Sequence, residues 1–150
     1  MKSINQRVEE FVKYHNEGDG ECNNVVLKAW ADRHGLNLQE RYELAYYFSI
    51  TYCVESALLL FKDRAGIYPN YKEWAKENKS KLIFQSDRKY MRMGSRFETC
   101  LEQFEKIHSV RDFLKGVERN GVVVLAKAIP LVSSWRLFGR FSAFLFLEHL

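Results

Sequence analysis

Apolar residues recur every three to four positions along most of this chain. That period is typical of amphipathic helices, so the sequence predicts an all-helical protein. The predicted helices cover about residues 4–17, 25–34, 38–64, 71–78, 95–108, 122–129 and 139–150.

The helix boundaries are marked by residues with known preferences for helix ends. Gly35 ends the second helix, since glycine readily adopts the left-handed conformation that follows a helix. Asn37 then offers a side-chain N-cap to the long third helix, which Gly66 and Pro69 end. Ser109 is placed to cap the short turn after the fifth helix. We expect the long third helix to be central.

Two stretches lack clear helical periodicity. Residues 80–94 are irregular, and a loop of this length invites a functional role. Asn120 and Gly121 break the chain, and the residues at 122–125 are β-branched enough to form a buried strand. Because no partner strand is apparent, we favour a helix that continues to Ile129.

The composition favours one helical domain. The chain has 150 residues, of which 47% are hydrophobic and 15% aromatic, with only two prolines and eight glycines. This suits long helices packed through aromatic side chains, so we predict an all-α, single-domain helical bundle over residues 1–150. Residues 1–36 either pack on the rest or form an N-terminal helical arm.

Residue patterns argue against several classes of protein. Three cysteines without pair spacing indicate neither a disulfide framework nor a zinc site. The four histidines lie near predicted helix ends without a second histidine at ligand spacing, so we expect no metal and no cofactor. No secretion signal is evident, and Glu55 interrupts the longest apolar stretch, which argues against a membrane span. We therefore expect a cytoplasmic protein.

Positive charge is concentrated in residues 62–96, which hold ten basic residues against four acidic ones, while the whole chain carries +4. Aromatic residues are interleaved with the basic ones. That mixture suits phosphate contacts combined with stacking on bases, so we predict contact with nucleic acid. The alternative is a solvated, flexible basic surface. The residues concerned are Tyr68, Tyr71, Lys72, Trp74, Lys76, Lys79, Lys81, Phe84, Arg88, Lys89, Tyr90, Arg92 and Arg96.

Glu55 is the most unusual ionisable residue, because it interrupts a nearly apolar predicted helix. It lies one turn from Tyr52, and with Ser49 and Ser56 these residues form a polar patch suited to lining a pocket. Burial would raise the pKa of the carboxyl toward the range useful for a general base. The alternative is a structural ion pair with an arginine or lysine of another helix.

The C-terminal region contains a Gly-Arg step at the start of a predicted helix. Pro130 predicts a turn before it, and Gly139 and Arg140 open a strongly apolar helix. Unpaired N–H groups at a helix N-terminus accept anions, and Arg140 adds a full charge, so this step is a candidate phosphate-docking element. The alternative is that Gly139 allows two helices to cross closely.

A further pattern is carried by short stretches between residues 38 and 150. They are Glu40-Arg41-Tyr42, Pro69, Trp74, Asp87-Arg88-Lys89-Tyr90, Trp135, Phe138-Gly139-Arg140 and the apolar residues 141–150. This pattern resembles the phage amino acid:DNA transferases, also called α-glutamyl/putrescinyl thymine pyrophosphorylases, which help to build hypermodified thymines. Such proteins are distant relatives of the helix-hairpin-helix DNA glycosylases, so the resemblance implies a helix-hairpin-helix fold and a flipped-out base.

The resemblance also implies a reaction, in the cytoplasm of an infected bacterial host. An amine from an amino acid or polyamine would displace pyrophosphate from pyrophosphorylated 5-hydroxymethyluracil in duplex DNA. Glu55 or Asp87 would deprotonate the attacking ammonium. The implied binding groups are Arg88, Lys89, Arg92 and Arg96 for pyrophosphate, Gly139 and Arg140 for the DNA backbone, and Tyr52, Tyr90 and Trp135 for the extruded base.

The residues leave two other functions open. One is a small phage helical protein that binds and inhibits a host or defence complex, and the other is a non-catalytic DNA-binding module. An enzyme predicts a concave pocket in which Glu55 or Asp87 converges with the arginine cluster. A binding protein instead predicts that these residues spread over a convex face.

Overall fold

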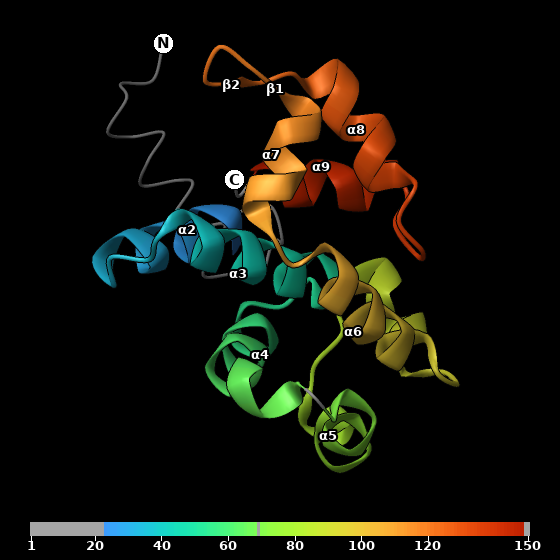
Figure 1. Ribbon diagram of the computed structural model, residues 1–150. Coiled ribbons are helices and arrows are strands. Elements are labelled where there is room, and N and C mark those ends of the chain that lie inside the picture. Colours follow the sequence, from blue (N-terminus) through green and yellow to red (C-terminus); the bar gives the residue numbers. More distant parts are fainter. Residues whose placement is uncertain (1–22, 69, 149–150) are drawn as a thin grey trace, which may run out of the picture. The chain divides into compact units, whose positions relative to one another are not determined.

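The computed structural model describes residues 23–68 and 70–148, apart from the side chains of Asn23, Asn24, Ser86 and Asp87. It confirms the predicted all-α class (Figure 1). The chain divides into two compact units, Met1–Gly35 and Leu36–Leu150. Within the described residues, no helix has the length and apolar character needed to cross a membrane.

The first unit contains α2 (Asn23–Arg33), close to the helix predicted over 25–34. Gly35 follows it at φ +63°, the left-handed conformation that favours glycine. Trp30 stacks on His34, with their ring centroids 4.2 Å apart. The helix predicted over 4–17 lies outside the described residues.

The second unit carries the remaining helices and one small hairpin. Its elements are α3 (Leu38–Thr51), α4 (Val54–Ile67), α5 (Tyr71–Asn78), η2 (Lys79–Lys81), η3 (Ser86–Arg92), α6 (Arg96–Ile107), α7 (Val110–Val117), β1 (Glu118–Arg119), β2 (Val122–Val123), α8 (Leu125–Ser133) and α9 (Arg140–Glu148). The elements η2 and η3 are 3-10 helices within the stretch predicted to be irregular.

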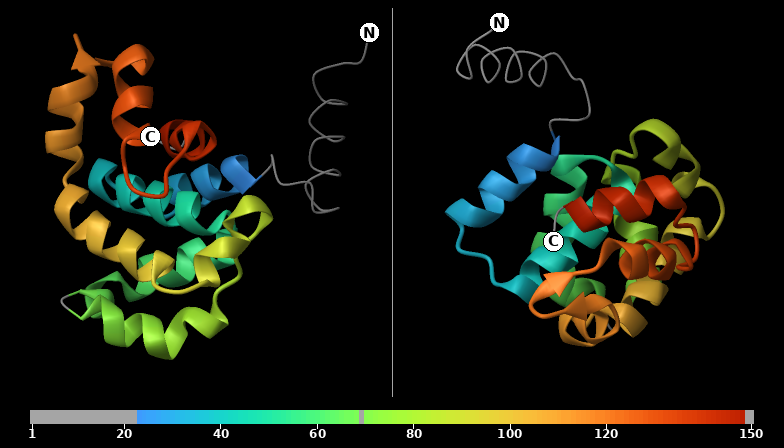
Figure 2. Two further views of the ribbon diagram at one scale, coloured as in Figure 1. Left: turned by 90° about the vertical axis from the view of Figure 1, so that its right-hand side faces the viewer. Right: turned by 90° about the horizontal axis from the view of Figure 1, so that it is seen from above.

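Helix α3 lies at the centre of this unit, as expected for its sequence. It packs against α4, α6, α7, α9 and η3, and Figures 1 and 2 show α4 and α5 on one side of it and α7 to α9 on the other. Residues 44–51 are all buried, because a helix that is apolar around its whole circumference must be enclosed. The capping box between Asn37 and Glu40 fixes where α3 begins, as predicted for Asn37.

Aromatic rings form much of the core around α3. Tyr46 stacks on Phe138 with ring centroids 5.3 Å apart and also contacts Phe104 at 4.5 Å. Its hydroxyl donates a hydrogen bond to the Cys100 carbonyl at 2.8 Å. Buried tyrosine hydroxyls usually find such a partner, so this part of the core combines ring packing with a fixed polar contact.

The single helix predicted over 38–64 is wrong, because the chain turns between α3 and α4. Tyr52 takes the left-handed conformation with φ +52°, and Cys53 is extended. The hydroxyl of Thr51 donates to the Tyr47 carbonyl at 2.9 Å and accepts from the Cys53 N–H at 3.4 Å. These side-chain bonds compete with the helical ones and let the chain fold back on itself.

The helix predicted over 122–129 is also wrong in its first half. Val122 and Val123 form β2, which pairs antiparallel with β1 across Asn120 and Gly121. Both turn residues have positive φ, at +54° and +76°, which suits a two-residue hairpin of this sequence. The partner strand is Glu118–Arg119, whose charged residues give no hydrophobic signal of a strand.

The turn predicted at Pro130 lies further along the chain. Pro130 is inside α8, which continues to Ser133, and the connection to α9 is residues 134–139. Proline removes only one hydrogen bond from a helix, and the buried Ala128 and Val132 on either side keep this segment packed. The predicted start of the last helix near 139 is confirmed by α9.

Candidate nucleic-acid interface

The 3-10 helix η3 separates two rows of side chains in the basic part of the chain. With three residues per turn, positions i and i+3 lie one above the other. Arg88 and Met91 form the inner row and are buried, whereas Lys89 and Arg92 form the outer row and are exposed. The local helix type therefore decides which cations reach solvent.

Arg88 joins η3 to the connection between α8 and α9. Its Nη1 atom donates to the hydroxyl of Tyr90 at 2.8 Å and to the carbonyl of Leu137 at 3.3 Å. Only 2% of the residue is exposed. The prediction that Arg88 contacts phosphate is wrong for this structure, because its guanidinium is enclosed by its own fold.

Arg96, the first residue of α6, lies over Tyr90. Its guanidinium carbon is 5.6 Å from the centroid of the Tyr90 ring, and its Nη1 atom donates to the Tyr90 carbonyl at 3.4 Å. Arg96 is exposed, so this contact holds the cation at the surface without burying it. Tyr90, predicted to stack on a base, thus has its ring engaged by Arg96.

Arg136 is fixed on the other side of the same junction. Its backbone N–H donates to Oε1 of Gln103 at 2.6 Å, and its carbonyl accepts from Nε2 of Gln103 at 3.3 Å. Burial raises the pKa of the Cys100 thiol to about 12, and both Arg88 and Arg136 oppose that rise. Leu137, whose carbonyl accepts from Arg88, follows Arg136 directly, which places the Arg136 backbone near η3.

We define the basic surface as the exposed cations of η3, the start of α6, and the segment 136–140. Figure 2 (left) shows η3 in yellow and the orange-red connection between α8 and α9 on the side that faces the viewer. Among the side chains that the structure describes, no carboxylate forms an ion pair with any of these cations. The members are Lys89, Arg92, Arg96, Arg136 and Arg140.

Gly139 and Arg140 stand at the beginning of α9, as predicted. Both are exposed, and the Gly139 carbonyl accepts the first helical hydrogen bond, from Ala143 at 3.0 Å. A Cβ atom built on Gly139 would meet nothing within 4 Å. The alternative that Gly139 permits a close helix crossing is therefore wrong, and phosphate docking at this step stays a prediction.

Tyr52 and Trp135 pack against other aromatic rings of the core. Tyr52 is 7% exposed and lies edge-on to Phe141 with ring centroids 5.7 Å apart. Trp135 is half-buried and packs on Phe138 and Phe146 at 5.4 and 5.2 Å. Base stacking on Tyr52 is contradicted by this burial.

Two exposed phenylalanine rings lie on α9 and were not predicted. Phe141, next in sequence to Arg140, is 48% exposed, and Phe144 is 55% exposed. The signal was present in the sequence, since two phenylalanines three apart lie on the same face of a helix. The neighbouring residues are also apolar, so the sequence did not show which of these side chains would be exposed.

Of the two candidate catalytic carboxylates, Glu55 is the one whose side chain the structure describes. Glu55 is exposed in the first turn of α4, and its Oε2 accepts a hydrogen bond from Cys53 Sγ at 3.1 Å. That bond, followed by one from a backbone N–H, lowers the pKa of the carboxyl below its ordinary value. The predicted burial and raised pKa are wrong, because the chain turns immediately before Glu55 and places it at a helix start.

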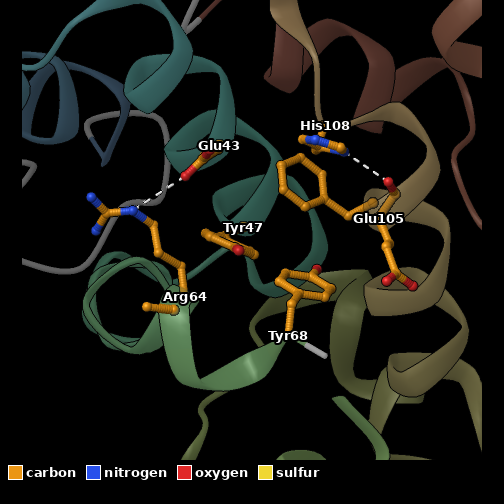
Figure 3. Close-up of a pocket in the computed structure, with 8 residues that line it drawn as sticks. Glu43, Tyr47, Arg64, Tyr68, Glu105 and His108 are labelled. Atoms are coloured by element: carbon orange, nitrogen blue, oxygen red, sulfur yellow. Dashed lines mark hydrogen bonds and ion pairs between the residues drawn. The ribbon is translucent and has the colours of Figure 1, made fainter. Parts of the chain in front are cut away.

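The alternative role for Glu55 is a structural ion pair with an arginine or lysine of another helix. Among the described side chains no arginine or lysine forms an ion pair with Glu55, so the structural pair is not found. The side chain of Asp87 lies outside the described residues. Figure 3 shows one pocket, between α3, α4 and α6, and none of the predicted site residues with described side chains lines it. Among those residues, only Trp135 lines a second pocket, whose other lining residues are Tyr42, Lys106, Ile107, Ser109, Asp112, Phe113 and Leu131.

Comparisons of this chain with protein-family models, with curated proteins and with solved structures found no match. The resemblance to the phage transferases therefore stays a prediction. What the structure contributes is the geometry of the basic surface and the positions of the candidate residues around it.

Proposed function

We propose that this protein is a nucleic-acid-binding module that contacts the phosphate backbone through the basic surface. The observation that carries the proposal is a group of exposed cations without carboxylate partners among the described side chains, held on fixed backbone. Arg88 donates to the Leu137 carbonyl, and the Gln103 side chain bonds to both backbone groups of Arg136. These bonds connect η3 and α6 to the segment 136–140, so the segments that carry the cations are held together. Phosphate binding by prearranged cations needs no further ordering of these segments.

Binding is better supported than catalysis by the same geometry. A general base needs a carboxyl whose pKa lies near the working pH, and the pKa of Glu55 is instead lowered. Tyr52 is covered, so it does not offer a ring face to an extruded base. Amine transfer to a pyrophosphorylated thymine, and a host-inhibiting role, are supported by no contact of the described residues.

The basic surface can be tested with a charge-matched pair of double variants. Lys89→Gln with Arg92→Gln removes two cations from the outer row of η3, and Lys72→Gln with Lys76→Gln removes two exposed cations from α5. We expect the first variant to bind a 20-base-pair DNA about tenfold more weakly and to lower the slope of log affinity against log salt by about 2, since each phosphate contact releases about one counterion. Fluorescence anisotropy at several salt concentrations measures both.

The control variant should keep the affinity within about twofold, because its cations lie outside the basic surface. Equal losses in the two variants would show that net charge alone drives binding. Failure of the wild-type protein to bind either duplex or single-stranded DNA at 50 mM salt would refute the proposal. Thermal melting of all three proteins shows whether each is folded.

A further inference from the structure

A pocket of about 360 Å³ opens between α3, α4 and α6, away from the residues of the basic surface (Figure 3). Its volume is at the lower end of the range of small-molecule sites. Three aromatic rings and two carboxylates contribute to its walls. The lining residues are Glu43, Tyr47, Arg64, Ala65, Tyr68, Phe104, Glu105 and His108.

Arg64, the one lining arginine, is already occupied by protein acceptors. Its Nη2 atom lies 3.2 Å from Glu40 and its Nε atom 3.3 Å from Glu43. Its Nη1 atom donates to the Phe61 carbonyl at 2.7 Å, and the guanidinium covers the Phe61 ring at 3.9 Å. All three nitrogens are thus engaged, so Arg64 has little capacity left to bind an anionic ligand.

The hydroxyl of Tyr47 is buried at the pocket and lacks a hydrogen bond. Tyr47 is 0% exposed, and among the described residues no atom meets hydrogen-bond geometry with its hydroxyl. The Tyr68 hydroxyl is close enough to lower the pKa of Tyr47 as a hydrogen-bonding neighbour, but it does not meet hydrogen-bond geometry with the Tyr47 hydroxyl and donates instead to the Leu101 carbonyl at 3.1 Å. A buried hydroxyl left in this state is unfavourable, and a ligand that supplies a donor would relieve it.

The electrostatics of the pocket favour a positive charge. Burial raises the pKa of Tyr68 first, the neighbouring Tyr47 raises it next, and the carboxylates of Glu105 and Glu43 raise it further. With Arg64 neutralised by Glu40 and Glu43, Glu105 adds a carboxylate without an ion pair among the described side chains. The faces of tyrosine and phenylalanine rings also attract cations.

We propose that this pocket binds a small organic cation, in which an ammonium group is attached to a flat apolar body. The ammonium donates to the Tyr47 hydroxyl oxygen and is attracted by the carboxylates of Glu43 and Glu105, while the apolar body lies against the ring of Phe104. This proposal is independent of nucleic-acid binding, because the pocket shares no residue with the basic surface.

Three compounds of one shape test the charge preference. Benzylammonium, benzyl alcohol and benzoate differ in the charge of the group attached to the ring. We expect benzylammonium to bind the full chain at millimolar concentration or tighter, benzyl alcohol at least about fivefold more weakly, and benzoate not measurably. Titration followed by ¹H–¹⁵N chemical shifts should place the changes at residues 43–47, 64–68 and 104–108.

Two variants test the proposed contacts. Tyr47→Phe removes the hydroxyl but keeps the ring, and should weaken benzylammonium binding about fivefold, the equivalent of one hydrogen bond. Glu105→Gln should weaken it about two- to fivefold, whereas Glu102→Gln, the same change on α6 outside the pocket lining, should leave it unaltered.

Three results would overturn the proposal. They are tighter binding of benzoate than of benzylammonium, no saturable binding of any of the three compounds, or an unchanged benzylammonium affinity in Tyr47→Phe. Because Tyr47→Phe removes a buried hydroxyl without a partner, we expect it to melt at the wild-type temperature or higher. A failed fold is therefore not the expected reason for a loss of binding.

Discussion

At the residue scale, the local environment rather than the residue type decides what each cation does. Arg88 and Lys89 are neighbours in sequence and carry the same charge. Arg88 is enclosed and bonds to Tyr90 and Leu137, whereas Lys89 is exposed. A buried guanidinium fixes structure, and an exposed lysine is available to a ligand.

Replacing these two residues separately should distinguish the roles. Arg88→Ala should lower the free energy of unfolding by about 3 kcal/mol, since it opens a cavity and removes the donor to the Tyr90 hydroxyl and the Leu137 carbonyl. Lys89→Ala should change it by less than about 0.5 kcal/mol. Urea unfolding at pH 7 measures both, and equal stability of the two variants would contradict the anchoring role of Arg88.

Glu55 gives a pH-dependent prediction whose sign follows from its contacts. The hydrogen bond from Cys53 favours the charged carboxylate, so the pKa of Glu55 in the folded protein lies below its ordinary value of 4.5. Its contribution to stability is therefore present above pH 4.5 and is lost as the pH falls through the lowered pKa.

We expect an NMR titration of the Glu55 carboxyl to give a midpoint below 4.5. Glu55→Gln should flatten the acid side of the stability profile slightly, because the side chain is largely exposed and its interactions are screened. A midpoint above 4.5 would restore Glu55 as a candidate general base.

At the element scale, backbone conformation sets where helices stop and which residues they present. The left-handed Tyr52 ends α3 and places Glu55 at the start of α4. The three-residue period of η3 exposes Lys89 and Arg92. Glu55, Lys89 and Arg92 thus owe their exposure to local features of single elements.

Two glycines provide a matched test of backbone conformation. Gly121 lies in the β1–β2 turn at φ +76°, whereas Gly66 is inside α4, and neither would bring a Cβ within 4 Å of another group. Gly121→Ala should destabilise the protein by about 1 kcal/mol, since only glycine adopts positive φ without strain. Gly66→Ala should stabilise it by about 0.5–1 kcal/mol, because alanine is the better helix former. Thermal unfolding decides, and shifts of the same sign would contradict this account.

At the scale of the whole molecule, the second unit is organised around one enclosed helix. Because α3 contacts α4, α6, α7, α9 and η3, the basic surface and the pocket are both built on a shared core. The pocket uses Glu43 and Tyr47 from α3, and η3 packs on the same helix. The two proposed sites thus share a scaffold but no residue.

Much of the fold could be predicted from the sequence by itself. Periodicity and end signals located α2, α5, α6 and α9, together with the cap at Asn37. Ser109, predicted to cap a short turn, instead caps the helix α7, which was not predicted. These features are local, since a helix period and a capping side chain involve residues only a few positions apart. The basic, aromatic character of residues 62–96 could also be read from the sequence.

Only the tertiary structure decided which of these residues are available to a ligand. Arg88 is buried, and it donates to the carbonyl of Leu137, 49 positions away. The pocket is lined by side chains of three helices. The turn before Glu55 and the β1–β2 hairpin are local features, but the first depends on side-chain hydrogen bonds and the second on a charged partner strand, and hydrophobic periodicity reveals neither. The burial of Arg88 and the shape of the pocket arise from contacts between distant parts of the chain, and no pattern of near neighbours encodes them.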